Sequence, residues 1–227
     1  FEDAVKASKE LGLTLTSRNK EKGQEVPLAG VPYHTANPYI AKLISRGYKV
    51  AICEQTEDPK EAKGIVKREV IKIITPGTVM DIETLDSKSN NYLMSIRVVE
   101  NAIGIAYIDI TTGEFKVSEV EGDTEYLKLF NELNKIEPKE ILVNPSFYES
   151  MKDRIDDFIQ RNESTVTLVQ KVRESEKMLM EYFGVVSLES YGINNKKALI
   201  EAAAMALDYA VTMQVEGDLT VEKIEFL

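Results

Sequence analysis

The sequence predicts an α/β fold in two domains: a small mixed-sheet domain, followed by a larger domain in which three strands precede alternating helices and strands. Apolar residues recur at helical spacing in some segments and alternate with polar residues in others, so each half should contain both helices and strands. The polar stretch of residues 82–91 follows neither period and is expected to link the halves. The 227 residues are enough for two ordinary domains with a sizeable core.

The first half is expected to open with an amphipathic helix over residues 1–11, which Gly12 ends. Residues 13–16 alternate between apolar and polar side chains and predict a short strand. Residues 18–25 are charged and polar, so they are expected to form an exposed loop between this strand and the next.

A second helix is expected from Pro38 to Gly47. Pro38 suits the first helical position because that position needs no backbone N–H, and Asn37 is the expected cap. Apolar residues then follow at helical spacing, and Gly47 is the expected stop.

Two strands complete the first half, at residues 48–55 and 65–75. The first is too short and too rich in β-branched residues for a helix, and its Ile52 and Cys53 are expected to be buried. The Pro76-Gly77 pair is a turn signal that should end the second strand.

The second half has the element order of the ribonuclease H-like fold. Three strands with tight connections are followed by alternating helices and strands, and two helices close the domain. The predicted strands are 92–99, 102–110, 114–120, 140–143 and 165–172, and the predicted helices are 124–135, 146–160, 174–183 and 195–214. The expected domains are therefore 1–81 and 92–214, and residues 215–227 are expected to start a following domain.

Charge is unevenly distributed between the halves. The formal net charge is −10, but residues 1–80 carry 13 basic and 10 acidic side chains. The basic surplus in the first half suggests that only this half meets phosphate groups. No apolar run is long enough to cross a bilayer, and the single cysteine excludes an internal disulfide and fits a reducing cytoplasm.

Three motifs carry a resemblance to a known family. They are GVPYH from Gly30, GYKVAICEQTEDP from Gly47 and VKREVIKIITPGT from Val66. In this order and spacing they resemble the mismatch-recognition domain of the MutS family of DNA mismatch-repair proteins. The resemblance continues to about Gln214, over the family's connector domain, which is itself similar to the ribonuclease H-like fold.

The resemblance implies three DNA-facing positions, and the charge pattern adds Lys67 as a fourth candidate. Arg18 matches an arginine that touches DNA, and Arg68 matches a basic residue that faces the backbone. Leu28 matches a position that approaches the minor groove, and Lys67 is a weaker basic candidate beside Arg68. In the family, specificity comes from a Phe-x-Glu pair, which is expected just before Phe1 together with a first strand.

The resemblance also implies partners and cofactors. Full-length relatives bind mispaired double-stranded DNA as ATP-dependent homodimers, and their connector meets a MutL-like protein. No phosphate-binding G-x-x-x-x-G-K-[ST] run is present, so ATP and Mg are expected only in other domains, and this chain is expected to be neither an enzyme nor cofactor-bound. The expected location is the bacterial cytoplasm, near the nucleoid, without membrane contact.

Two alternatives remain open. A ribonuclease H-like nuclease would need strand carboxylates that converge on metal ions, but residues 92–99 contain none, and Asp109 sits beside a turn that a short acid commonly organises.

A protein–protein interaction module is the other alternative. Its candidate surface is the helix 174–183, with Lys177 and Met178, although methionines there are more often core residues.

Overall fold

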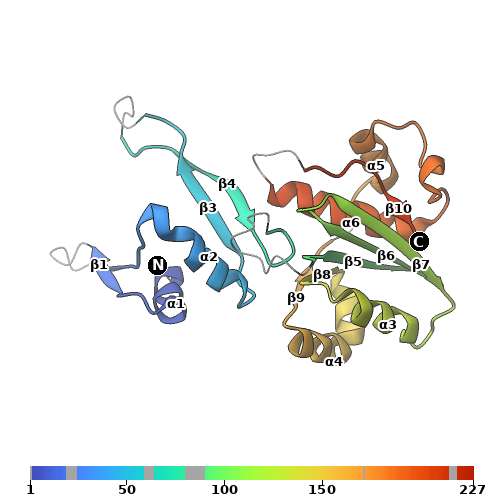
Figure 1. Ribbon diagram of the computed structural model, residues 1–227, viewed down its shortest axis with the longest axis horizontal. Coiled ribbons are helices and arrows are strands. Elements are labelled where there is room, and N and C mark those ends of the chain that lie inside the picture. Colours follow the sequence, from blue (N-terminus) through green and yellow to red (C-terminus); the bar gives the residue numbers. More distant parts are fainter. Residues whose placement is uncertain (1, 19–24, 59–63, 80–89, 171, 215–218) are drawn as a thin grey trace.

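The computed structural model describes residues 2–18, 25–58, 64–79, 90–170, 172–214 and 219–227. Its helices and strands form a small N-terminal part, a two-stranded ribbon, and a larger sheet covered by helices (Figure 1). The mixed α/β class predicted for both halves is confirmed. Within the described ranges, no helix is both long enough and apolar enough to cross a membrane.

The first half contains helices α1 (Glu2–Leu11) and α2 (Ala36–Ile44) and the 3-10 turn Tyr33–Thr35. Its strands pair two by two: β1 (Thr16–Arg18) with β2 (Val26–Leu28), and β3 (Val50–Gln55) with β4 (Arg68–Ile74). Both pairs are antiparallel, and they form two separate sheets in the described residues. One small mixed sheet was expected for this half, whereas the described strands form two separate pairs.

Two element starts differ from the prediction. The first strand begins at Thr16 and not at residue 13, because the chain after Gly12 first turns back, with the Leu13 N–H donating to the Ser8 carbonyl at 3.0 Å. Helix α2 starts at Ala36 with Thr35 as its N-cap, because the preceding 3-10 turn runs directly into it. Neither Asn37 nor Pro38 therefore marks its start.

The second half is built on one six-stranded sheet with the order β10-β7-β6-β5-β8-β9. Its strands are β5 (Leu93–Val99), β6 (Ala102–Asp109), β7 (Glu114–Glu121), β8 (Glu140–Val143), β9 (Thr165–Leu168) and β10 (Glu225–Phe226). Only β6 runs against its neighbours, since β5, β8 and β9 are parallel and β10 is parallel to β7. This is the strand arrangement expected of a ribonuclease H-like sheet.

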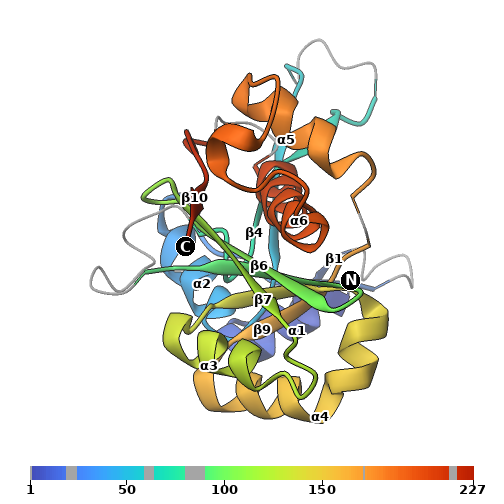
Figure 2. The same ribbon diagram turned by 90° about the vertical axis from the view of Figure 1, so that its right-hand side faces the viewer.

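Helices cover both faces of this sheet (Figure 2). They are α3 (Leu127–Ile136), α4 (Pro145–Asn162), α5 (Ser175–Phe183) and α6 (Lys197–Met213), with a 3-10 turn at Glu189–Tyr191. Side chains alternate between two cores: Leu93 packs toward α5 and α6, whereas Met94 packs toward α3 and α4. Strand side chains point to opposite faces in turn, and this produces the three-layer arrangement.

Helix α6 lies unusually close to the sheet. A Cβ atom on Gly104 of β6 would lie 2.1 Å from the Ala198 carbonyl oxygen, so only glycine fits there. On the neighbouring strand β5, the Ser95 hydroxyl donates a hydrogen bond to the Ala202 carbonyl of α6 at 2.6 Å. The alanine-rich stretch Ala202–Ala204 is fully buried, which explains why α6 is apolar around most of its circumference.

The C-terminal segment, residues 219–227, packs against the second sheet, whereas it was expected to lead away from it. Val221 and Ile224 are buried in the core on the α6 side, and β10 adds a parallel edge strand to β7. The described residues 219–227 therefore pack on the second sheet, and the start of a following domain within residues 215–227 stays a prediction. Val221 and Ile224 are only two apolar residues, three positions apart, and such a short pattern does not predict burial from the sequence.

Candidate nucleic-acid interface

Two of the predicted DNA-facing residues lie on or beside the ribbon formed by β3 and β4, hereafter the β3–β4 ribbon. At the base of the ribbon, Val50 is paired with Ile74. At its outer end, Gln55 is paired with Arg68 (Figure 1). Only one face of the ribbon packs on the first half: Val50 and Ile52 are half-buried, while Cys53 is exposed. The prediction that Ile52 and Cys53 are both buried is therefore wrong, because a two-stranded ribbon has one covered face and side chains alternate across it.

Arg68 and Lys67 lie at the outer end of this ribbon, and both are exposed. The Lys67 ammonium forms an ion pair with the Glu69 carboxylate at 2.6 Å, and this hydrogen-bonded carboxylate raises the pKa of Lys67. Lys67 is therefore cationic but already partly neutralised by its neighbour, whereas Arg68 presents its guanidinium to solvent. Lys60 and Lys63, also basic, lie outside the described residues.

The β1–β2 pair holds the other two predicted positions. Leu28 lies at the end of β2, paired with Thr16, and is 42% exposed although it is apolar. The Thr16 hydroxyl donates to the Leu28 carbonyl at 3.0 Å and closes this end of the pair. The Arg18 backbone pairs with Val26, and its side chain lies outside the described residues. The DNA-facing roles of these residues stay predictions.

The predicted partner surface lies on α5. Lys177 is exposed and close to Glu174 and Glu181, at 3.6 and 3.9 Å. Met178 is half-buried and packs against the core beneath α6. The two residues therefore face different surroundings, and of the two only Lys177 presents an open surface to a partner.

Asp109 does not lie in a metal-binding constellation. Its carboxylate accepts hydrogen bonds from the Thr111 N–H at 2.9 Å, the Thr111 hydroxyl at 2.6 Å and the Asn91 N–H at 3.2 Å. These contacts stabilise the turn after β6. Across the described ranges, no three His, Cys, Asp or Glu side chains are grouped in a way that could hold a metal ion.

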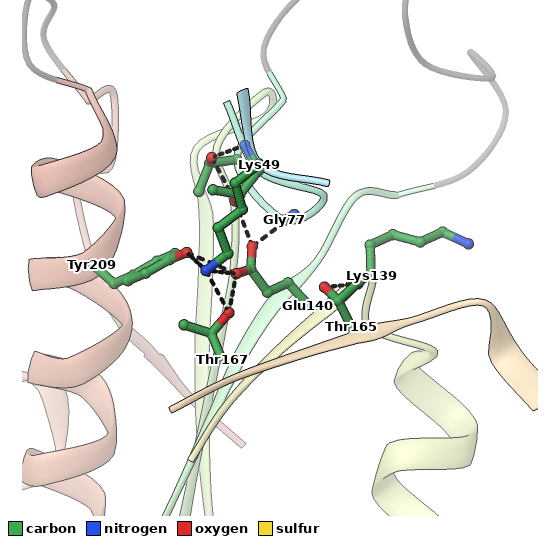
Figure 3. A network of polar contacts seen from close by, with 9 residues as sticks. Lys49, Gly77, Lys139, Glu140, Thr165, Thr167 and Tyr209 are labelled. Atoms are coloured by element: carbon green, nitrogen blue, oxygen red, sulfur yellow. Dashed lines mark hydrogen bonds and ion pairs between the residues drawn. The ribbon is translucent and has the colours of Figure 1, made fainter. Parts of the chain in front are cut away.

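A polar network that the sequence analysis missed connects the base of the ribbon to the second sheet (Figure 3). Its centre is Glu140, the first residue of β8, whose side chain is completely buried. The contacting groups are Lys49, Thr75, Gly77, Thr167 and Tyr209. We call this set the Glu140 joint. The only sequence signal was an acid at the start of an otherwise apolar strand, and the TPGT run read simply as a turn.

The fold and the ribbon define an α/β protein that carries a two-stranded ribbon beside a ribonuclease H-like sheet. The family model for MutS domain I matches residues 1–83, and the model for MutS domain II matches residues 91–224. The chain therefore belongs to the MutS family.

Curated relatives agree with this assignment. A DNA mismatch repair protein MutS from Fusobacterium nucleatum is 48% identical over all of this chain, which covers 25% of that relative. Similar proteins of the same name come from Lachnoclostridium phytofermentans, 45% identical over 94% of this chain, and Methanococcoides burtonii, 38% identical over 94%. The chain spans about a quarter of the length of these relatives.

Proposed function

We propose that this chain is the part of a DNA mismatch-repair protein that faces mispaired duplex DNA and connects this contact to the rest of the protein. The observation that carries the proposal is the match of both family models, in order and over nearly the whole chain. In the proposed division, residues 1–81 face DNA and residues 92–214 form the connector, extended by the segment that adds β10.

Arg18 and Arg68 are the proposed phosphate contacts, and Leu28 is the proposed apolar contact in the minor groove. An exposed apolar side chain at the end of a strand suits this role, because minor-groove binders place apolar side chains against base steps that are easily unstacked. Lys67 contributes less, since its ion pair with Glu69 must be exchanged for a phosphate contact.

The proposed role of this chain is binding, and catalysis is assigned to other domains. ATP and Mg belong to those domains in the proposed full-length protein, which acts as a homodimer in the cytoplasm near the nucleoid. The second half is the proposed contact for a MutL-like partner, with Lys177 on α5 as its exposed residue.

The test compares the full-length protein on two short duplexes that differ by one mispair, by fluorescence anisotropy at a fixed salt concentration. The expected result is tighter binding to the mispaired duplex. Equal affinity for both duplexes would overturn the proposal. The same samples, incubated with manganese and an RNA–DNA hybrid, should leave the hybrid intact; metal-dependent cutting would favour the nuclease alternative.

A further inference from the structure

The Glu140 carboxylate is shared between the two halves of the chain. One oxygen, Oε1, accepts from the Tyr209 hydroxyl at 2.7 Å and the Thr167 hydroxyl at 2.6 Å, both in the second half. The other, Oε2, accepts from the Thr75 hydroxyl at 2.5 Å and the Gly77 N–H at 3.2 Å, both in the turn that follows β4. The same buried acid therefore holds the sheet on one side and the ribbon on the other (Figure 3).

Lys49 adds a second connection from the residue just before β3. Its ammonium lies 3.3 Å from Glu140 Oε1 and donates to the Thr167 and Tyr209 hydroxyls at 2.8 and 2.9 Å. Burial and the nearby carboxylate raise the pKa of Tyr209, so its hydroxyl stays a donor to Glu140. Both strands of the ribbon are thus held at their base, one through Lys49 and the other through Thr75.

The turn after β4 is inserted into the second half and does not merely lie against it. Thr75 and Thr78 are completely buried, and their hydroxyl oxygens are 2.8 Å apart. A Cβ atom on Gly77 would lie 2.8 Å from the Glu140 Cβ and 3.0 Å from a Leu93 methyl carbon. The turn therefore fits only without a side chain at Gly77, and its position relative to β5 and β8 is closely defined.

Hydrogen bonds define this contact more narrowly than apolar packing would, because they weaken steeply with distance and angle. The orientation of the ribbon decides where Arg68 lies, because a small tilt at the base becomes a large displacement at the outer end. The seven residues of β4 span about 20 Å, so a tilt of about 10° at the base would move Arg68 by roughly 3–4 Å. Such a shift exceeds the range over which a guanidinium keeps a hydrogen bond to a given phosphate.

We propose that Glu140 is a positioning residue, which fixes the angle of the β3–β4 ribbon relative to the second sheet and so places Arg68 for its contact with the DNA backbone. The DNA part of this inference rests on the proposed function. The geometric part does not, and it is tested without DNA.

The test measures the distance between two spin labels on the 227-residue chain. In a Cys53→Ser background, one label is placed at Gln55→Cys, opposite Arg68, and the other at Asp153→Cys on the exposed side of α4. The parent chain should give one narrow distance distribution. Glu140→Gln keeps the side-chain shape, but its amide NH₂ must point either at the Thr75 and Gly77 donors or at the Lys49 ammonium. The distribution should therefore broaden or shift.

Glu201→Gln is the matched control. Glu201 is also a buried acid of the second half, and it pairs at 2.9 Å with Arg97 of β5, in the same half. This variant should keep the parent's distribution. An unchanged distribution in folded Glu140→Gln overturns the proposal. If Glu140→Gln does not fold, the same distance measurement is made on Gly77→Ala, whose distribution should broaden or shift. Gly30→Ala is its control and should keep the parent's distribution, because a Cβ atom there meets nothing within 4 Å.

The DNA arm uses the full-length protein. Glu140→Gln should weaken binding to both matched and mispaired duplexes at least threefold and flatten the slope of log affinity against log salt by up to about one unit, because Arg68 no longer reaches its phosphate. Parent-like affinity despite a broadened distance distribution overturns the positioning role. If the parent protein fails to prefer the mispaired duplex, the proposed function fails, and the label distances still decide whether Glu140 orients the ribbon.

Discussion

At the scale of single residues, Arg68 carries the sharpest prediction. It lies exposed at the outer end of the β3–β4 ribbon, in the half of the chain with a basic surplus. Arg68→Ala in the full-length protein should flatten the slope of log affinity against log salt by about one unit, because one phosphate contact is lost. Matched and mispaired duplexes should weaken by similar factors, since phosphate contacts position the protein without reading sequence.

The control for Arg68 is Arg161→Ala. Arg161 is an exposed arginine on α4, paired with Asp157 at 2.7 Å, and it lies in the second half of the chain. Its removal changes the net charge equally but should leave the slope unchanged. If both variants change the slope alike, the effect is one of overall charge, and the ribbon does not lie along the backbone.

Cys53 tests the burial pattern of the ribbon at the same scale. The thiol is exposed on the uncovered face of β3, so Ellman's reagent should titrate one thiol per chain in the native protein at close to the rate in urea. A native rate many-fold slower than in urea would mean that this face is covered, contrary to the described structure.

At the scale of elements, the C-terminal segment provides the clearest prediction. Ile224 is buried against the α6 side of the sheet next to β10, so Ile224→Ala should lower the free energy of unfolding by about 2 kcal/mol or more. Leu227→Ala removes an exposed side chain nearby and should cost no more than about 0.5 kcal/mol. Urea unfolding followed by circular dichroism measures both. Equal, small effects would contradict the burial of Ile224 against the sheet.

At the scale of the whole molecule, the two halves differ in the size of their hydrophobic cores. Among the described residues, the core cluster of the first half contains only Ile44, Ile74 and Val79 as buried members, whereas two large clusters lie on the faces of the second sheet. A small core stabilises a small domain only marginally. Residues 90–227 should therefore fold alone with a cooperative thermal transition, and residues 1–90 alone should not.

Scanning calorimetry and circular dichroism of the two separate pieces measure this difference. The piece 90–227 should also melt below the parent chain, because Glu140 then lacks Thr75, Gly77 and Lys49 as partners. A cooperative transition in the piece 1–90 would show that the first half is stable without the Glu140 joint.

The sequence by itself determined the class of fold, the order of the elements in the second half, and the family. These follow from local patterns: alternation along strands, helical spacing of apolar residues, and turn signals such as Pro76-Gly77, which the structure confirms as a turn with the Thr78 N–H donating to the Thr75 carbonyl. Strand β8 was predicted with its observed bounds, Glu140–Val143, because a short apolar run between turns leaves little choice.

Tertiary structure alone decided which faces are covered and what holds the halves together. Cys53 was expected to be buried because its neighbours are apolar, but a two-stranded ribbon covers one face only. Glu140 looked like an ordinary strand acid, since its partners come from residues that are 27 to 91 positions away in the chain, from Lys49 to Tyr209. Long-range polar contacts leave no period in the sequence, and for this reason the Glu140 joint emerged only from the folded chain.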